Sequence, residues 1–245
     1  MINHLPEQKN RQIPITPIAT GSSKLNSKEN SEDRDSNALI TWQTQVADVI
    51  TDIDQLLAIL ELTHIKSKLY IPEGFGLRVP RGFVAKMKKG DPNDPLLFQV
   101  LPNKLEQVKV SGYVADPLAE NEQNPTQGLL HKYHSRVLVT VTGACAIHCR
   151  YCFRQHFDYQ ANLPKSEQLE VIKAYIGQHP EIREVLLSGG DPLSVSNRRL
   201  FLWLDALESI PQITTIRIHT RLPIVIPERL DSELLSRLEA SRCRI

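Results

Sequence analysis

The alternation of apolar and polar residues becomes regular past the middle of the chain, and from there it predicts a fold. Strand-like apolar runs cover 136–142, 184–188 and 214–220. Apolar residues then recur at helical spacing, in segments that cover 166–178, 196–209 and 228–241. A repeated order of strand and helix predicts parallel strands joined by right-handed crossovers. We therefore expect an α/β fold in 136–245.

The chain before this region has a different organisation. Residues 1–38 are polar and interrupted by prolines, so they carry too little apolar surface to offset the entropy of ordering, and we expect a mobile polar tail. Residues 39–135 form a helical and turn-rich N-terminal region. A pair of helices is predicted in 41–62, where Thr51 and Asp54 have the spacing of a capping box.

Three strand–helix units make up only part of a closed barrel. A complete barrel of eight units needs ~250 residues, whereas the regular region here begins only at Arg136 of 245 residues. The sequence ends at Cys243-Arg-Ile245, in the middle of a repeating pattern, and we expect it to be truncated at the C-terminus. The alternative is an intact chain that completes its sheet by dimerising, because sheet edges are rarely left open.

Three of the four cysteines follow the first predicted strand at a spacing of three and then two residues: Cys145, Cys149 and Cys152. Thiolates on one short loop can turn toward a single metal centre. Three ligands on a four-iron cluster would leave one iron open to a small molecule. A zinc site with His148 or His156 as fourth ligand would use the same cysteines, and three inert buried thiols remain a further alternative.

The composition and net charge of the chain argue against several classes of function. The net charge is +1 and aromatic residues make up 6% of the chain, so neither nucleic acid nor an anionic membrane is an expected partner. No apolar run approaches the ~20 residues of a membrane span, and the N-terminus has no apolar segment typical of a signal peptide. Clustered cysteines without a secretion signal indicate a reducing compartment, and we expect a cytoplasmic protein.

The cysteine motif, with an aromatic residue before its last cysteine, resembles the cluster motif of the radical S-adenosylmethionine enzymes. Four further runs make the combination similar to lysine 2,3-aminomutase, and these are 133–145, 152–154, 188–193 and 216–227. The run 80–96 resembles the short bacterial branch of that family, which makes β-lysine for the modification of elongation factor P. The resemblance implies a partial parallel (β/α) barrel of the radical S-adenosylmethionine type.

The resemblance also implies three cofactors: a [4Fe-4S] cluster, S-adenosylmethionine and pyridoxal 5'-phosphate. It assigns the cluster to the three cysteines and S-adenosylmethionine to Ser188, Gly189, Gly190 and Asp191. It places Tyr133 and Arg136 near pyridoxal phosphate, and Arg154 on the substrate carboxylate. From the residues alone, Ser-Gly-Gly-Asp is equally typical of a tight strand-to-helix turn, and Arg154 could be a surface arginine.

Three further residues have possible roles at such a site. Lys132 supplies a positive charge near the expected phosphate, and Arg150 could tune the cluster potential, because charge near a cluster shifts it. His219 ends the third predicted strand, where it could face the cavity or be a hydrogen-bonded structural histidine.

Two groups that the family requires have no counterpart in the chain. These are the lysine that binds pyridoxal phosphate and the acidic residues that recognise the distal ammonium of the substrate. We therefore expect that this chain alone cannot complete the reaction. The implied partners are L-lysine, a reductant protein such as flavodoxin or ferredoxin, and elongation factor P with its lysyl ligase. The alternatives are a catabolic lysine 2,3-aminomutase and a zinc-stabilised binding module without catalysis.

Overall fold

The structure is a computed structural model that describes residues 41–70, 74–108, 110–114, 118, 120, 123–164 and 167–245. These residues fall within one compact unit, Leu39–Ile245. The predicted polar tail, 1–38, lies outside the described residues. The division of the remainder at 135/136 stays a prediction.

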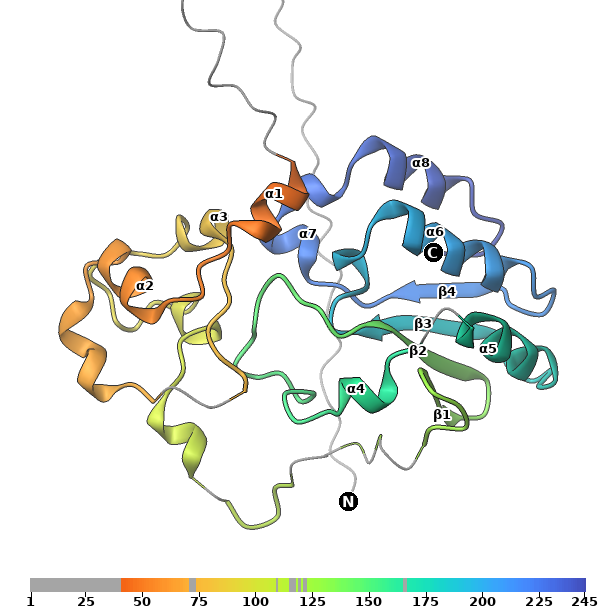
Figure 1. The fold of residues 1–245 in the computed structure, drawn as a ribbon, viewed down its shortest axis with the longest axis horizontal. Helices are drawn as coiled ribbons and strands as arrows, with labels where there is room; N and C mark the ends of the chain where they lie inside the picture. Colours follow the sequence, from red (N-terminus) through yellow and green to blue (C-terminus); the bar gives the residue numbers. More distant parts are fainter. Residues whose placement is uncertain are drawn as a thin grey trace, which may run out of the picture. The chain divides into compact units, whose positions relative to one another are not determined.

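The described strands form one four-stranded sheet in the order β1-β2-β3-β4 (Figure 1). The strands are β1 (Leu129–Tyr133), β2 (Arg136–Thr142), β3 (Glu184–Gly189) and β4 (Thr215–Ile218). Strands β2, β3 and β4 are parallel, with Val137 opposite Val185 and Val185 opposite Ile216. The three predicted parallel strands, and with them the partial α/β barrel, are therefore confirmed.

Strand β1 is the element that the hydrophobic pattern did not predict. Its residues read as a connector into the first strand, but they pair antiparallel with β2, with Leu129 opposite Val139. Only Leu129 and Leu130 of its five residues are buried. A strand this short, with so little alternation of buried and exposed residues, has no recognisable two-residue period in the sequence. It is identified as a strand only by its pairing with β2.

Three amphipathic helices follow the parallel strands: α5 (Gln168–Gly177), α6 (Asn197–Glu208) and α8 (Ser232–Glu239). The first two agree with the predicted helices to within about two residues at each end. The third starts later than the predicted 228, because the Asp231 carboxylate caps α8 by accepting the Leu234 N–H at 2.8 Å. The preceding residues form two short helical turns instead, α7 (Leu222–Val225) and η6 (Pro227–Arg229), and a third, η5 (Pro192–Ser194), lies between β3 and α6.

The N-terminal region is built from short helices joined by turns. They are α1 (Trp42–Ala47), α2 (Ile53–Ile59), η1 (Thr63–Lys68), α3 (Arg81–Val84), η2 (Leu97–Gln99) and η3 (Lys104–Gln107). The predicted helical pair is present as α1 and α2, but the predicted cap is wrong. Asp52, rather than Thr51, is the N-cap of α2, and its carboxylate accepts the Asp54 N–H at 2.7 Å. One further helix, α4 (Tyr159–Asn162), lies between the cysteine motif and α5.

The two faces of the sheet have different roles. Val139 on β2 and Leu187 on β3 are fully buried, in the same hydrophobic core as Ile172 of α5 and Leu204 of α6. The opposite face carries partly exposed residues, and Leu138, Leu186 and Ile218 line two cavities there. The sheet therefore packs against helices on one face and leaves the other face available for a ligand.

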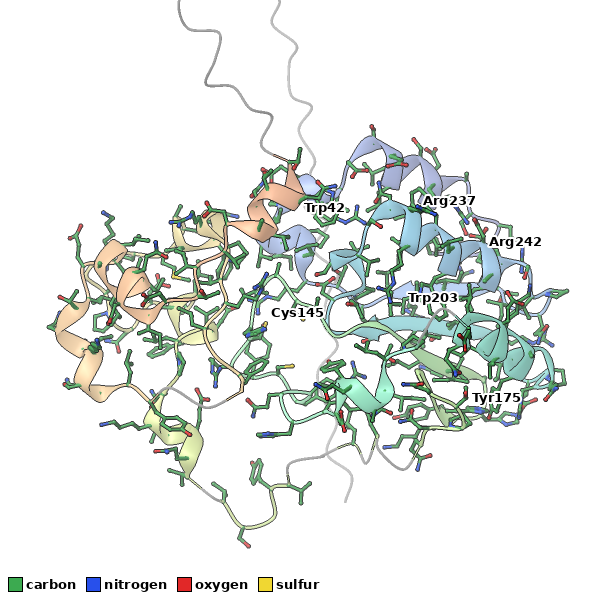
Figure 2. All side chains as sticks on the ribbon, viewed as in Figure 1. Trp42, Cys145, Tyr175, Trp203, Arg237 and Arg242 are labelled. Atoms are coloured by element: carbon green, nitrogen blue, oxygen red, sulfur yellow. The ribbon has the colours of Figure 1, made fainter. Side chains whose placement is uncertain are left out.

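A buried arginine joins the N-terminal region to the barrel. The Arg229 side chain is fully buried, and its guanidinium lies 4.5 Å from the centre of the Trp42 ring (Trp42 is labelled in Figure 2). Its Nε donates to the Leu193 carbonyl at 2.7 Å, and its Nη2 donates to the Val195 carbonyl. These contacts connect α1, η5 and η6.

Replacement of Arg229 should therefore destabilise the fold. We expect Arg229→Met to lower the free energy of unfolding by about 3 kcal/mol, because it leaves two buried carbonyls without a donor. Urea unfolding followed by circular dichroism measures this. Arg198→Met, on the exposed surface of α6, is the matched control and should change stability by less than about 0.5 kcal/mol. Equal stabilities for the two variants would contradict the role of Arg229.

Candidate active site

The carboxyl ends of the three parallel strands meet at one large cavity. The cavity has a volume of about 880 Å³, and each strand contributes the loop that follows it. The loop after β2 supplies the three motif cysteines, the loop after β3 supplies Ser188 to Asp191, and the end of β4 supplies His219 to Arg221. Parallel α/β folds place their ligands at this end of the sheet. The residues singled out in the sequence are thus brought together.

Hydrogen bonds join the main chain of the cysteine loop to residues of the N-terminal region. The Arg78 guanidinium donates from Nε to the Cys145 carbonyl at 2.8 Å. The His148 N–H donates to the Arg78 carbonyl at 2.9 Å, and the Arg150 N–H donates to the Gln99 carbonyl at 2.9 Å. The shape of the loop therefore depends on residues 40 or more positions earlier in the chain. Nothing in the sequence motif indicates these partners.

Arg150 is part of the same attachment. Its Nε donates to the Glu106 carboxylate at 3.0 Å, its Nη1 donates to the Phe75 carbonyl at 2.9 Å, and the guanidinium lies over the Phe75 ring. Its positive charge is therefore balanced by Glu106. A role in tuning a cluster potential stays a prediction, and the contacts by themselves describe a residue that anchors the loop.

Burial raises the pKa of two of the three motif cysteines. Burial raises the pKa of Cys145 to about 12, with further contributions from Asp191 and the other two cysteines. Burial also raises the pKa of Cys152. The Arg221 guanidinium lies beside Cys149, and its Nη1 donates to the Cys149 sulfur at 2.6 Å. Positive charge placed beside Cys145 and Cys152 would favour their thiolate forms.

The glycines of the Ser188–Asp191 loop allow it to pack directly on the cysteine loop. Gly189 has a φ of +110°, which other residues rarely adopt. A Cβ atom on Gly190 would lie 2.5 Å from the Ala144 carbonyl oxygen. The Gly190 N–H donates to the Thr142 carbonyl at 2.6 Å, and the Asp191 N–H donates to the Ala144 carbonyl at 2.9 Å.

The Asp191 carboxylate accepts hydrogen bonds from other residues of the chain. It accepts the Leu193 N–H at 3.0 Å, the Thr220 hydroxyl at 2.7 Å and the Arg221 N–H at 2.8 Å. It thereby ties the loop after β3 to the loop after β4. The tight-turn interpretation of Ser-Gly-Gly-Asp is therefore realised here, and any contact of this loop with a cofactor would be additional to it.

Arg154 is buried in the cavity wall, so it is not a surface arginine. Its Nε and Nη2 donate to the two Glu120 oxygens at 2.8 and 2.7 Å, and its Nη1 donates to the Ser188 hydroxyl at 2.9 Å. Arg154 and Glu120 are 7% and 8% exposed. Glu120 lies in a turn-rich segment with no periodic pattern, and no sequence feature indicated it as a site residue.

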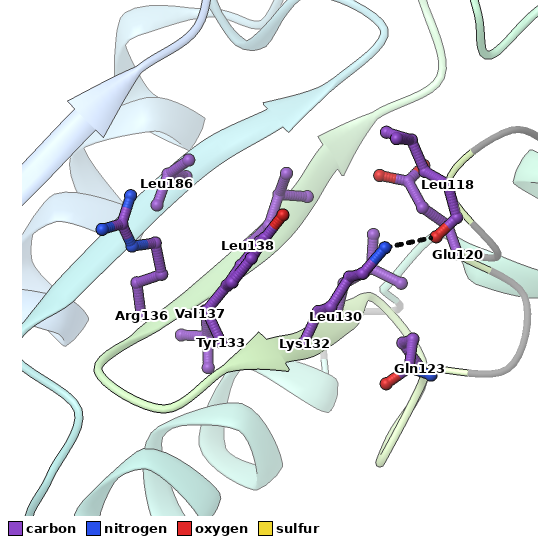
Figure 3. A pocket seen from close by; sticks show the side chains of 10 residues that line it. All are labelled: Leu118, Glu120, Gln123, Leu130, Lys132, Tyr133, Arg136, Val137, Leu138 and Leu186. Atoms are coloured by element: carbon purple, nitrogen blue, oxygen red, sulfur yellow. Dashed lines mark hydrogen bonds between the residues drawn. The ribbon is translucent and has the colours of Figure 1, made fainter. Parts of the chain in front are cut away.

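Tyr133 and Arg136 lie at the other end of the site, around a second cavity of about 210 Å³ (Figure 3). The Arg136 guanidinium lies over the Tyr133 ring and 3.8 Å from the Glu184 carboxylate. Lys132 donates from Nζ to the Leu118 carbonyl at 2.9 Å. Both cavities are lined by Glu120, Tyr133 and Leu138, and the two spaces therefore adjoin.

The remaining residues of interest are histidines and Arg221. Burial lowers the pKa of His219, which lines the large cavity, so this side chain is neutral at pH 7. The His148 Nδ1 donates to the Gly76 carbonyl at 2.9 Å, and its ring stacks on Phe75. Arg221 was overlooked as a site residue, although its place at the end of a predicted strand could have indicated it.

Comparison with known proteins agrees with this architecture. Residues 139–239 match the Radical SAM superfamily. Over 208 residues the chain is 45% identical to the L-lysine 2,3-aminomutase of Escherichia coli, which covers 83% of this chain and 60% of that protein. The protein of the same name from Haemophilus influenzae is 41% identical over 203 residues, or 82% and 60% of the two chains. The L-lysine 2,3-aminomutase of Clostridium subterminale is 33% identical over 202 residues, which cover 81% of this chain and 48% of that protein.

Residues 139–239 belong to the radical S-adenosylmethionine superfamily, as the three-cysteine loop at the end of a parallel strand indicated. The chain as a whole is similar to proteins named L-lysine 2,3-aminomutase. Membership implies an iron–sulfur cluster and S-adenosylmethionine. The chain spans about 60% of the length of the first two curated relatives.

The cysteines fit a four-iron cluster better than a single metal ion. All three line one cavity together, on one loop. Among the described residues, no three His, Cys, Asp or Glu side chains lie close enough together to hold one ion. Cluster ligands bind separate iron atoms and need not converge on one point. Of the two histidines considered as a fourth zinc ligand, His148 lines the cavity, whereas His156 is exposed and does not.

Proposed function

We propose that this chain carries the radical-generating part of an L-lysine 2,3-aminomutase, which converts L-lysine to β-lysine. The observation that carries the proposal is the convergence of the cysteine loop, the Ser188–Asp191 loop and Arg154 on one cavity. The relatives named L-lysine 2,3-aminomutase support the choice of reaction.

Each part of the cavity has a proposed role. Cys145, Cys149 and Cys152 hold the cluster and leave one iron for S-adenosylmethionine, which the Ser188–Asp191 loop approaches with its backbone. Pyridoxal phosphate fits the adjoining smaller cavity at its phosphate end, because Tyr133 and Arg136 offer a hydroxyl and a guanidinium there. No lysine of the described part of the chain lines the larger cavity, so we assign no residue to its covalent attachment.

The cofactors supply a carbon radical and an aromatic ring that assists amino-group migration, and the protein supplies orientation. Arg154 holds the substrate carboxylate through its guanidinium and sets the direction of the carbon chain relative to the cysteine loop. The apolar side chains of Leu138 and Ile218 in the cavity wall exclude water from the substrate. The neutral His219 adds no charge beside Arg154.

The proposal extends to the setting of the reaction. The run 80–96 supports a role in the modification of elongation factor P, with its lysyl ligase as the next functional partner. A flavodoxin or ferredoxin supplies the electron. The clustered thiols support a cytoplasmic location. No helix in the described part of the chain is long and apolar enough to cross a membrane.

The test is anaerobic reconstitution with iron and sulfide, followed by electron paramagnetic resonance of the reduced protein. We expect a four-iron signal that changes when S-adenosylmethionine is added, because one iron is open. Alanine at Cys145, Cys149 or Cys152 should abolish this signal. Cys243→Ala is the matched control, since Cys243 is buried beside the Ile213 carbonyl and does not line the cavity. A colourless protein with one zinc ion would refute the proposal.

A further inference from the structure

Glu120 and Arg154 form a buried ion pair inside the candidate active site, and the pair has two possible relations to a bound carboxylate. Glu120 could be a stand-in that a ligand carboxylate must displace. It could instead be a permanent partner that fixes the guanidinium while a ligand binds elsewhere on it. The two relations predict opposite effects of removing the Glu120 charge, so the geometry of the pair decides what should be measured.

The hydrogen bonds show which part of the guanidinium is used. Glu120 accepts from Nε at 2.8 Å and from Nη2 at 2.7 Å, and Ser188 accepts from Nη1 at 2.9 Å. A guanidinium has five N–H groups. These three bonds therefore leave one N–H group on each terminal nitrogen, and a second carboxylate can use them without displacing Glu120.

Burial argues against displacement. The side chains of Arg154 and Glu120 are 7% and 11% exposed. A carboxylate that replaced Glu120 would have to break a buried, doubly hydrogen-bonded ion pair, which is strongly unfavourable. A ligand that adds to the pair avoids this cost. Both residues line the large cavity, together with Ser188 and the three cysteines, so the pair lies where a ligand can reach it.

Arg154 and the two residues that bind its guanidinium come from different segments of the chain. Glu120 comes from the connector before β1, Arg154 follows the cysteine motif, and Ser188 ends β3. Two segments, separate from the one that carries Arg154, therefore bind its guanidinium. Arginine is rich in rotamer freedom, and these bonds remove that freedom before a ligand arrives, which favours binding through preorganisation.

We propose that Glu120 is a positioning residue that holds Arg154 by its Nε–Nη2 edge, so that the remaining N–H groups receive the carboxylate of the substrate. The inference rests on the proposed function only in naming that carboxylate as the α-carboxylate of an amino acid such as L-lysine. Ser188 completes the arrangement as a neutral acceptor that adds no competing charge.

The test is calorimetric titration of the full reconstituted chain with L-lysine and with L-lysine methyl ester, which lacks the carboxylate. We expect the wild-type chain to bind L-lysine at least about tenfold more tightly than the ester, as for a hydrogen bond to a charged group. Glu120→Gln should remove most of this preference and leave ester binding unchanged. Tighter L-lysine binding by Glu120→Gln would show displacement and overturn the inference, as would a wild-type chain without any preference.

Two further variants keep the test interpretable. Glu208→Gln alters a comparable ion pair with Arg237 outside the cavity, and it should leave the carboxylate preference intact. Glu120→Asp keeps the charge but shortens the side chain, and it should retain part of the preference. If Glu120→Gln does not fold in thermal melts, Glu120→Asp carries the test, and tighter binding again overturns the inference.

Failure of this inference can be told apart from failure of the proposed function. A chain with a cluster that responds to S-adenosylmethionine but with equal affinity for L-lysine and its ester would overturn only the role of Glu120. A chain without that cluster that still prefers L-lysine, and loses the preference in Glu120→Gln, would support the ion-pair role and refute the radical chemistry.

Discussion

Gly190→Ala is expected to lower the free energy of unfolding by about 3 kcal/mol, at the upper end of overpacking effects, and to abolish the response of the cluster to S-adenosylmethionine. The new Cβ would lie 2.5 Å from the Ala144 carbonyl oxygen and 2.7 Å from the Gly143 carbonyl carbon. Both are backbone atoms and cannot rotate away. The loop after β3 must then separate from the cysteine loop, and the N–H bonds of Gly190 and Asp191 to that loop are lost.

Gly177→Ala is the matched control for this substitution. Gly177 is the last residue of α5, and a Cβ there meets nothing within 4 Å. Its stability should stay within about 1 kcal/mol of the wild type or rise, because alanine favours a helix. Urea unfolding and the electron paramagnetic resonance signal with and without S-adenosylmethionine measure both effects. Wild-type stability and an unchanged response in Gly190→Ala would show that the two loops need not touch.

Arg154→Met is the second variant with a large expected effect. It should destabilise the fold by about 4 kcal/mol, because removal of one partner from a buried ion pair is strongly unfavourable. It should also remove the preference for L-lysine over its methyl ester. The ion pair is 7% and 11% exposed at its two side chains, so solvent screens it only slightly.

A double variant separates these two effects of Arg154. Glu120→Gln/Arg154→Met removes both charges of this buried pair, and we expect it to recover most of the stability that Arg154→Met loses. It should not recover the carboxylate preference, which requires the guanidinium. Urea unfolding and calorimetry on the same preparations provide the comparison. A double variant as unstable as the single one would mean that packing, rather than charge, explains the loss.

Periodicity predicted the elements that bury a complete face. Strands β2 and β3 and helices α5 and α6 were found because their apolar residues repeat with the period of the element. Strand β1 was missed because only its first two residues are buried. The boundary of α8 was misplaced because the Asp231 cap, rather than the apolar pattern, determines where that helix begins.

The candidate site was predictable in its parts and not in its connections. The cysteine spacing and the glycines after β3 indicated where a ligand lies, because strand ends carry the sites of parallel sheets. Glu120 and Arg78 were not predictable, since each acts on a residue 34 or 67 positions away in the chain. Asp191 was predicted to lie in a tight turn or to contact a cofactor, but the bonds of its carboxylate to Thr220 and Arg221 depend on the neighbouring loop.

The attachment of the cysteine loop to the N-terminal region limits how far the motif can be transplanted. Copying residues 145–152 onto another half-barrel would transfer the spacing of the sulfur atoms but not the contacts from Arg78, Gln99 and Glu106 that shape the loop. A designer would have to move 75–106 with the motif. The unit of engineering for this metal centre is therefore a pair of distant segments.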